Sequence, residues 1–211
     1  MAAMPLRVAL VDDHAVVRAG YRRLLELEGI AVALEAADAD SAYAALGRAD
    51  TLPVDVLIVD LSLPGRGGLD FVRQLRRRWP EARVLVFTMH DDPATVAQCL
   101  RAGAAGFVTK SSDPALLVQA VLGVARGETA LSPDVAGHQG RADAAPHAAL
   151  STREFEVLRG LLAGRGVDEI ALRLHVSAKT VANYQTAIRQ KLGVANAVEL
   201  LQYARRHGLA P

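Results

Sequence analysis

The sequence predicts an α/β domain with a doubly wound parallel sheet, followed by a small domain made only of helices. Up to about residue 127, short apolar runs alternate five times with amphipathic segments, as in parallel strands whose connecting helices cover both faces of a sheet. From residue 148 only the 3.6-residue period of helices remains. Between these parts, residues 128–147 are rich in Gly, Ala, Pro and His and show no sustained period. We therefore expect one domain at 1–127, a linker at 128–147 and a second domain at 148–211.

Five strands are expected in the first domain. The run from Val56 to Val59 is wholly apolar and mostly β-branched, which suits a strand buried on both faces of a parallel sheet. The expected strands are 6–11, 30–36, 56–59, 83–88 and 106–109. The order of the strands along the chain does not fix their order in the sheet, although the right-handed crossover rule restricts it.

Five helices are expected between and after these strands. Gly29 ends the first helix, Pro80 stops the third, and an Asp-Pro pair begins each of the last two with a cap and a proline. Their approximate limits are 15–28, 40–48, 69–78, 93–103 and 114–126. The inner face of the first helix is assigned to Val17, Tyr21, Leu24, Leu25 and Leu27.

The linker is expected to contain one short helical turn near residues 133–136. If it is flexible, 20 residues span about 25 Å root-mean-square, which would let the two domains dock in several ways.

The last 64 residues predict four helices. Ser151 and Glu154 have the spacing of a capping box, and Ser177 caps a third helix that Gly193 stops. The approximate limits are 151–164, 168–174, 178–192 and 196–207, and the third helix has Val181, Tyr184, Ile188 and Leu192 on its inner stripe. Two helices joined by a tight turn inside such a unit have the outline of a helix-turn-helix domain.

Composition indicates a well-cored globular protein, with 51% hydrophobic and 22% charged residues. Cys99 is the only cysteine, so an internal disulfide is excluded and a buried residue in a reducing compartment is expected. No apolar run approaches the roughly 20 residues of a membrane span, and residues 1–6 lack the pattern of a signal peptide. We expect a cytoplasmic protein without membrane contacts.

The net charge of +1 hides a difference between the two domains. Residues 1–127 carry 14 Lys and Arg against 15 Asp and Glu, whereas residues 148–211 carry nine against five. The basic excess of the second domain is a weak indication that it meets a polyanion.

Residues able to carry chemistry follow four of the five strands. Asp12 and Asp13 follow the first strand, Asp60 the third and Lys110 the fifth, while Thr88 ends the fourth. Ligands of open α/β sheets bind at the carboxyl ends of the strands, so these side chains are expected to share one site. Three carboxylates repel one another there, and Mg²⁺, which prefers oxygen ligands, relieves the repulsion.

The same residues suit phosphoryl transfer to a carboxylate. Asp60 would keep a free oxygen to attack phosphorus, while the metal, Lys110 and Thr88 would neutralise the phosphoryl oxygens. Each residue also has a plainer interpretation. Asp12 or Asp13 could cap the first helix, and Asp60 could cap the loop that follows it. Thr88 could form a hydrogen bond with its own backbone, and the Lys110 side chain could simply be solvated. Their shared position at strand ends favours the common site.

These residues, with Leu63-Pro64-Gly65 after Asp60, resemble the receiver domain of two-component response regulators over about residues 6–127. The resemblance implies a flavodoxin-like (βα)₅ fold. It also implies that Asp60 is the phosphoacceptor and that Asp12, Asp13 and Asp60 hold Mg²⁺. Thr88 would be the switch hydroxyl and Lys110 the partner of the phosphoryl group. A phosphoacceptor of this kind is not an enzyme, although slow self-dephosphorylation is compatible with it.

Two positions of the receiver pattern leave alternatives open. Phe107 falls at the switch aromatic position, but it could equally be an ordinary core residue on its strand. Many receivers have proline after the lysine, whereas this chain has Ser111, which leaves open whether the usual cis peptide follows Lys110.

Residues 148–211 resemble the LuxR-type helix-turn-helix domain. The matching stretches are 150–154, 169–171, 176–177, 179–181 and 191–194. The outward face of the helix 178–192 presents small and amide residues suited to base edges, and Lys and Arg suited to phosphates. The candidate DNA contacts are Lys179, Thr180, Ala182, Asn183, Thr186, Arg189 and Lys191.

This helical domain also departs from the family pattern. Many relatives carry a basic residue in place of Ala182 and His in place of Tyr184, so the outward face is only moderately basic and could be a solvated helix face. The fourth helix is expected to expose Leu200, Tyr203 and Ala204. By family analogy these residues form a dimerisation face; ordinary core packing is the alternative.

Both resemblances together identify the chain as similar to NarL/FixJ-type transcriptional response regulators. They imply a sensor histidine kinase as phosphodonor and double-stranded promoter DNA as target. They also imply a homodimer when phosphorylated, with RNA polymerase as a further partner.

Three other functions remain as alternatives. A haloacid-dehalogenase-like phosphohydrolase also uses an aspartyl nucleophile, but places it in a DxD after the first strand, whereas Asp60 follows the third. A LuxR-type autoinducer sensor would need a ligand pocket, usually rich in aromatic residues, where residues 1–127 carry the acidic site. A receiver that works without phosphorylation would not need the complete acidic set.

Overall fold

A computed structural model of the chain describes residues 5–47, 52–65, 67–136, 147, 150–174 and 176–209. The described residues form two compact units, one built on a sheet and one made of the C-terminal helices. Residues 92–98 group with the second unit, but we describe their helix with the sheet because it continues the strand–helix alternation.

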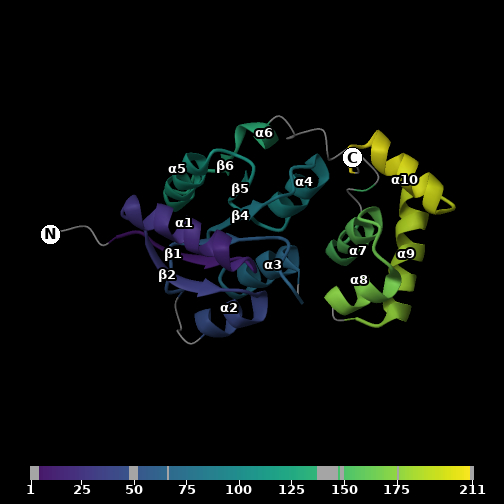
Figure 1. Ribbon diagram of the computed structural model, residues 1–211, viewed down its shortest axis with the longest axis horizontal. Coiled ribbons are helices and arrows are strands. Elements are labelled where there is room, and N and C mark those ends of the chain that lie inside the picture. Colours follow the sequence, from purple (N-terminus) through teal and green to yellow (C-terminus); the bar gives the residue numbers. More distant parts are fainter. Residues whose placement is uncertain are drawn as a thin grey trace. The chain divides into compact units, whose positions relative to one another are not determined.

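The first unit is a parallel sheet with helices on both faces (Figure 1). Its strands lie in the order β2-β1-β3-β4-β5-β6, and all neighbouring pairs are parallel. The chain moves outward from β1 in one direction and from β3 in the other, which is the doubly wound arrangement. The strands are β1 (Arg7–Val11), β2 (Ala31–Ala36), β3 (Val56–Val59), β4 (Val84–Thr88), β5 (Gly106–Thr109) and β6 (Ala130–Leu131).

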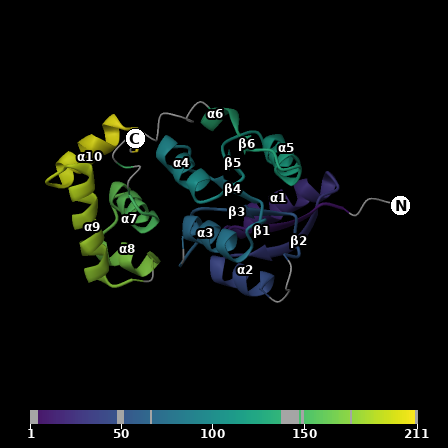
Figure 2. The same ribbon diagram turned by 180° about the vertical axis from the view of Figure 1, so that it is seen from behind.

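Five helices accompany the sheet and bury its two faces. On one face, Leu25 of α1 packs in a cluster with Leu117 and Val121 of α5. Helices α2 and α3 lie on the other face (Figures 1 and 2). The helices are α1 (Ala15–Leu27), α2 (Ala39–Leu46), α3 (Gly68–Arg78), α4 (Pro93–Arg101) and α5 (Pro114–Ala125). The predicted α/β fold and each of its five strands and helices are thus confirmed; the predicted end of the second helix at Arg48 lies outside the described residues.

One assignment on α1 is wrong. Leu27 was expected on the inner face, but its side chain is 66% exposed, whereas Leu25 is fully buried. Leu27 lies roughly a quarter of a turn outside the stripe of Val17, Tyr21, Leu24 and Leu25, at the last helical position before the turn at Gly29.

A sixth strand, β6, extends the sheet beyond the five expected strands. It pairs with β5 through Gly106 opposite Ala130 and Phe107 opposite Leu131. A Cβ at residue 106 would lie 2.7 Å from the Ala130 carbonyl oxygen, so this close pairing requires glycine. Two residues are too few to show a strand period, which is why the sequence did not predict β6.

The short helix α6 (Pro133–Ala136) follows β6 at the predicted place. Its Asp134 accepts a 2.5 Å hydrogen bond from the Thr109 hydroxyl at the end of β5 and a 3.1 Å bond from Ser112. Residues 130–136 are therefore held against the sheet. Residues 137–146 of the predicted linker lie outside the described residues.

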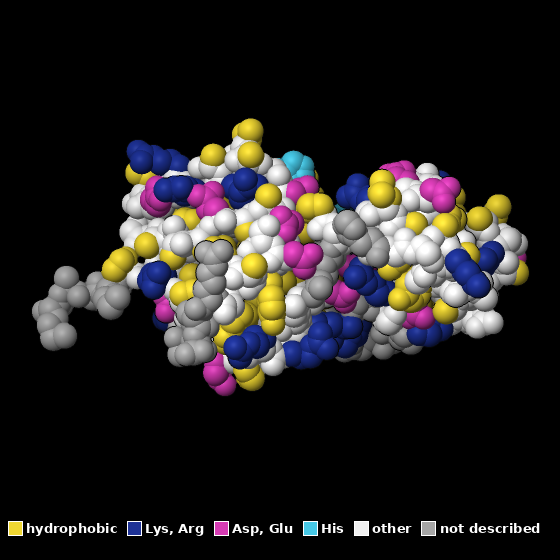
Figure 3. Space-filling model, turned by 90° about the horizontal axis from the view of Figure 1, so that it is seen from below, with side chains coloured by type: hydrophobic (Ala, Val, Ile, Leu, Met, Phe, Trp, Pro, Cys, Tyr) yellow, Lys and Arg dark blue, Asp and Glu magenta, His cyan; other side chains and the backbone are white. Residues whose placement is uncertain are grey.

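Arginines are concentrated on α3, and Figure 3 shows Lys and Arg side chains gathered over this helix. Arg76 donates to the carbonyl groups of Pro80 and Ala82 and so closes the turn between α3 and β4. The Arg78 guanidinium lies 5.4 Å from the centroid of the Trp79 ring, within the range of a cation–π contact. Part of this arginine run therefore stabilises the end of its own helix.

The second unit consists of four helices around one core. They are α7 (Thr152–Leu162), α8 (Val167–Leu174), α9 (Ala178–Leu192) and α10 (Ala197–Arg206). The predicted capping box is present, since Ser151 Oγ accepts from the Glu154 N–H and Glu154 Oε2 accepts from the Ser151 N–H. Phe155, Leu158 and Ile188 are among the buried residues of the core. None of the described helices has the length and apolar character that crossing a membrane requires.

The expected exposed face of α10 is wrong as assigned. Leu200, Tyr203 and Ala204 are buried, because they pack into the core of the same unit. The Tyr203 hydroxyl is also bonded, accepting from the His147 N–H at 3.2 Å and lying 2.9 Å from the His147 Nδ1. The exposed apolar side chains of this helix are Val198 and Leu201.

Candidate functional site

Asp60 lies directly after β3, at the carboxyl edge of the sheet. Its N–H donates to the Val11 carbonyl of β1 at 2.9 Å, which continues the strand ladder and fixes the backbone. The side chain is buried, with 3% exposure. The start of α3 closes over it: a Cβ on Gly68 would lie 2.2 Å from the Asp60 carbonyl oxygen, so a larger residue would push this helix away.

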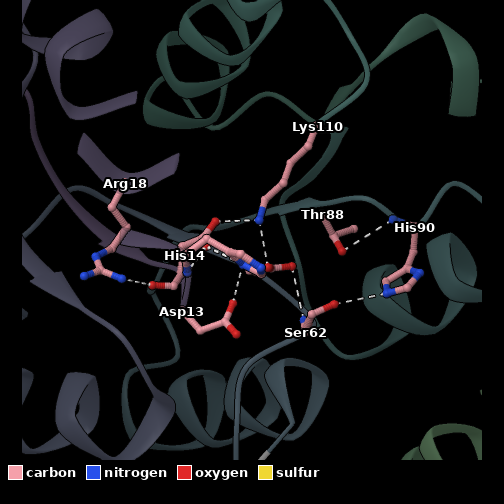
Figure 4. A network of polar contacts seen from close by, with 9 residues as sticks. Asp13, His14, Arg18, Ser62, Thr88, His90 and Lys110 are labelled. Carbon is pink, nitrogen blue, oxygen red and sulfur yellow. Dashed lines mark hydrogen bonds and ion pairs between the residues drawn. The ribbon is translucent and has the colours of Figure 1, made fainter. Parts of the chain in front are cut away.

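Lys110 bridges two carboxylates from different strands. Its Nζ lies 2.8 Å from Asp60 Oδ2 and 2.5 Å from Asp12 Oδ2 (Figure 4). Asp12 is 1% exposed, so all three charged groups are almost removed from water. The strand ends of β1, β3 and β5 thus bring together residues that are far apart in the sequence, as the strand-end argument predicted.

The surroundings of Lys110 favour its charged form. Burial acts to lower the pKa of its ammonium, but the hydrogen bonds and charges of Asp12 and Asp60 outweigh burial and raise that pKa above its ordinary value. The group is therefore a permanent cation at neutral pH, and one positive charge faces the carboxylates of Asp12, Asp13 and Asp60.

The carboxylates fit a hard dication. Among the described residues, Asp12 Oδ2 is a buried oxygen that receives no well-oriented hydrogen bond, although Lys110 lies close to it. Asp12, Asp13, His14 and Asp60 each offer one ligand atom, and these atoms all lie within 4.8 Å of one another. Carboxylate oxygens at this spacing are the donor set that Mg²⁺ prefers.

Thr88 and Phe107 occupy the other predicted positions. Thr88 is fully buried at the end of β4, and its Oγ1 lies 3.5 Å from the His90 N–H. Phe107 is fully buried on β5. The described residues contain no cis peptide bond, so the bond between Lys110 and Ser111 is trans, which answers the question that the missing proline left open.

Three residues of this site were not singled out from the sequence. The Ser62 N–H donates to Asp60 Oδ1 at 3.1 Å, and its hydroxyl lies 3.2 Å from His90 Nε2. His14 places Nδ1 2.7 Å from Asp13 Oδ1 (Figure 4). Each follows one or two residues after a predicted strand-end residue, so the sequence indicates that it lies near the site but not which way its side chain points.

The helical unit presents the predicted outward face on α9. Its buried stripe contains Val181, Ile188 and Leu192, and Ser177 caps its first turn by accepting from the Thr180 N–H. The side chains of Lys179, Ala182, Asn183, Thr186 and Gln190 are exposed.

Four of the candidate DNA contacts are already engaged within the unit. The Thr186 hydroxyl donates to the Ala182 carbonyl at 3.1 Å. The Lys191 ammonium lies 2.6 Å from Glu154 Oε2, and the Thr180 hydroxyl lies 2.8 Å from Ser177 Oγ. Arg189 is half-buried, and its Nε donates to the Gln185 carbonyl at 3.3 Å. Lys179 and Asn183 are therefore the most accessible of the predicted contacts.

Comparison with protein families gives a match to each half of the chain. Residues 8–122 match the response regulator receiver domain. Residues 148–204 match the luxR family of bacterial regulatory proteins.

Two relatives are similar to this chain over nearly its whole length. The chain is 36% identical to the response regulator UvrY of Escherichia coli over 97% of its own length and 95% of that protein. It is 41% identical to the transcriptional regulatory protein UhpA of Salmonella typhimurium over 92% and 95%.

Solved structures are similar over nearly the whole chain. RcsB of Salmonella enterica serovar Typhimurium, bound to promoter P1flhDC in the presence of the phosphomimetic BeF₃⁻, is 32% identical over 94% of this chain and 98% of that chain, with a TM-score of 0.72. RcsB of Salmonella typhimurium in another structure is 30% identical over 99% and 100%, with a TM-score of 0.77.

Proposed function

The chain belongs to the NarL/FixJ-type two-component response regulators, and from this membership we propose that phosphorylation of Asp60 controls its binding to promoter DNA. A phosphoacceptor pocket in the sheet unit and a luxR-type DNA-binding unit are the two parts of such a regulator. We propose the receiver at residues 1–127 and the DNA-binding domain at 148–211, joined by residues 128–147, of which 130–136 pack against the receiver sheet.

The arrangement of Asp12, Lys110 and Asp60 carries this proposal. One Asp60 oxygen faces Lys110 and the other accepts from the Ser62 N–H, so the carboxylate is held in a fixed orientation. An Asp60 oxygen attacks phosphorus of a phosphohistidine on a sensor kinase, the bond from phosphorus to the histidine nitrogen breaks, and an acyl phosphate forms. Lys110 then pairs with a phosphoryl oxygen, and Thr88 donates its hydroxyl to another.

Asp12, Asp13 and Asp60 would hold Mg²⁺ in this scheme. The dication supplies charge neutralisation for the carboxylates and the phosphoryl oxygens. The Ser62 N–H and Lys110 orient the Asp60 carboxylate, and the burial of Asp12 and Asp60 excludes most water from it.

The DNA-binding half acts through α9. The relatives support this assignment, since RcsB is described bound to promoter DNA and as two dimers bound to two parallel DNAs. We propose that this chain likewise binds double-stranded promoter DNA as a homodimer when phosphorylated, contacts RNA polymerase there, and works in the cytoplasm.

Phosphorylation with a small-molecule donor tests the proposal. Acetyl phosphate with Mg²⁺ should raise the intact mass by one phosphoryl group, and Asp60→Ala should abolish the gain. Asp55→Ala is the matched control, since Asp55 is the neighbouring carboxylate at the other end of β3 and caps the Arg7 N–H.

Two outcomes would contradict this function. Phosphorylation that persists in Asp60→Ala would move the acceptor elsewhere, and phosphorylation that proceeds equally in EDTA would remove Mg²⁺ from the scheme. Promoter binding that is unchanged by phosphorylation would instead support a receiver that works without it.

A further inference from the structure

An imidazole lies within the cluster of carboxylates at the sheet edge. His14 Nδ1 is 2.7 Å from Asp13 Oδ1 and 3.5 Å from Asp12 Oδ1. Figure 4 shows the ring close to the labelled Asp13 side chain. Of the His, Cys, Asp and Glu residues in the described part of the chain, His14 is the one nitrogen donor that joins Asp12, Asp13 and Asp60 in a possible metal site.

The ring is not used for the local structure of the helix. His14 is the N-cap residue of α1, but its side chain accepts no capping hydrogen bond from a described residue. Its backbone N–H instead donates to Asp12 Oδ1 at 2.8 Å, which fixes residue 14 beside the cluster. The side chain is 63% exposed, so apolar packing does not hold the ring there.

The spacing of the four donors is close to that around a single ion. Ligands on opposite sides of an octahedral ion with Mg²⁺-like bond lengths lie about 4.2 Å apart. The four donor atoms lie within 4.8 Å of one another, so the widest pair needs to close by only a few tenths of an ångström per atom. The His14 and Asp13 side chains are exposed and have room to adjust.

We infer that His14 Nδ1 is a fourth protein ligand, and that this site binds nitrogen-preferring dications such as Ni²⁺ more tightly than its carboxylates alone would. The inference rests on the proposed function, because the carboxylates of the phosphoacceptor site form the rest of the ligand set. It adds a ligand and a metal preference to that site.

Ligand chemistry gives the direction of the preference. Imidazole suits Ni²⁺, Cu²⁺ and Zn²⁺, whereas carboxylates suit Mg²⁺. Mg²⁺ and Ni²⁺ are similar in size and both accept octahedral geometry, so the imidazole changes the donor type without a change of cavity. When Nδ1 binds a metal, the ring proton resides on Nε2. Because the ring is exposed, this Nε2–H can donate a hydrogen bond to water.

The inference has a consequence for the phosphoacceptor. An ion held by His14, Asp13 and Asp60 uses the same carboxylates that Mg²⁺ needs, so the two metals compete. A Ni²⁺-loaded receiver is then a distinct state of the protein, which excess Mg²⁺ reverses.

Calorimetric titration of the full chain tests the preference. His14→Ala should weaken Ni²⁺ binding by on the order of ten-fold or more, while Mg²⁺ binding changes by less than two-fold. Displacement of Ni²⁺ by excess Mg²⁺ confirms that both ions use this site. His207→Ala is the control, since His207 is an exposed histidine of the helical unit and should leave Ni²⁺ affinity unchanged.

Pulsed EPR of the Mn²⁺-loaded protein reads the ligand directly. A coupling to a directly bound ¹⁴N nucleus should appear in the native chain and in His207→Ala, and should be absent from His14→Ala. Equal Ni²⁺ affinity in the native chain and His14→Ala, or a ¹⁴N coupling that persists in His14→Ala, would overturn the inference. Failure of Mg²⁺ to bind while Ni²⁺ binds through His14 would refute the proposed function and leave this inference standing.

Discussion

At the scale of single residues, Lys110 supplies the positive charge that offsets the repulsion between the buried carboxylates of the acidic site. It stands between Asp12 and Asp60, which are both buried, and the raised pKa of its ammonium shows that the carboxylates stabilise its charged form. Removal of a buried cation leaves its partners uncompensated, which costs far more than the loss of a surface pair.

Lys110→Met should therefore destabilise the protein strongly in the absence of metal. We expect a loss of about 3 kcal/mol in the free energy of unfolding, because Asp12 and Asp60 lose their shared partner. Mg²⁺ should restore part of the loss, since it supplies positive charge to the same oxygens. Urea unfolding in EDTA and in Mg²⁺ measures both effects, with Lys179→Met as the exposed control.

Equal stability of Lys110→Met and the native chain in EDTA would show that another group neutralises the carboxylates.

The site residues divide by how far their positions follow from the sequence. Asp12, Asp60 and Lys110 could be predicted to meet because strand ends of a parallel sheet share one edge. His14, Ser62 and His90 could not be placed in the same way. They lie in loops, where the direction of a side chain depends on backbone turns that no residue period specifies.

At the scale of elements, an ion pair between Glu154 and Lys191 ties α7 to α9. Glu154 is buried at the start of α7, where it completes the capping box, and its Oε2 also lies 2.6 Å from the Lys191 ammonium. Burial acts to raise the pKa of Glu154, but Lys191 and the Ser151 N–H lower that pKa by more than burial raises it.

The stabilisation from Glu154 should disappear in acid. A carboxyl group whose pKa is lowered by folding stabilises the folded state above its unfolded pKa of about 4.3, and this contribution is lost as the pH falls through the folded pKa. The destabilisation caused by Glu154→Gln should thus be largest at neutral pH and shrink as the pH falls through the lowered folded pKa of Glu154. Thermal unfolding at neutral and at acid pH, with Glu128→Gln as the exposed control, checks the trend.

An undiminished effect of Glu154→Gln in acid would mean that shape or capping, and not charge, connects the two helices.

The outward face of α9 should contain two separable kinds of DNA contact. Lys179→Ala should weaken binding to cognate and random duplexes alike, because a phosphate contact carries no sequence information. It should also reduce the slope of the logarithm of the binding constant against the logarithm of the salt concentration by about one. Asn183→Ala should cost roughly 1–3 kcal/mol on the cognate site only, because an amide pairs with a base edge. Titrations of both variants on cognate and scrambled DNA at two salt concentrations separate the two roles.

Arg126→Ala is a suitable control for these titrations, since Arg126 is a cation of the sheet unit that is paired with Glu128. If Asn183→Ala loses affinity equally on both DNAs, base reading belongs to another residue of α9. A dimer should read two half-sites about 10 base pairs apart.

The elements themselves were predicted well where a period is long enough to recognise. The limits of β3, β5 and α9 agree with those expected from apolar runs and from the caps at Ser177 and Gly193. Strand β6 was missed because two backbone pairs determine it, and its side chains carry no alternation. The burial of α10 was also misjudged, because a single helix does not reveal which neighbours cover it.

At the scale of the whole molecule, the proposed function needs a signal from the acidic site to reach the DNA-binding unit. Thr88 is the first residue able to carry it, since it is buried at the end of β4 directly before the segment that leads into α4. Phosphoryl oxygens should draw its hydroxyl inward, and Phe107 should turn into the vacated space and change the adjoining surface.

Thr88→Ala should accept a phosphoryl group normally but fail to dimerise in response. The hydroxyl that senses the phosphoryl oxygen is gone, whereas Asp60 and Lys110 remain. Sedimentation of the protein with and without phosphorylation measures the coupling, and Thr88→Ser, which keeps the hydroxyl, should recover it. Normal phosphorylation-dependent dimerisation of Thr88→Ala would refute this route.

The short strand β6 also determines whether the isolated sheet unit self-associates. It covers the outer edge of β5 with only two residues, supported by Asp134. An uncovered strand edge is a template for pairing with other chains. A fragment that stops at residue 127 would therefore present β5 to its neighbours and self-associate at high concentration, whereas one that continues through residue 136 would keep its own edge shielded and stay dispersed.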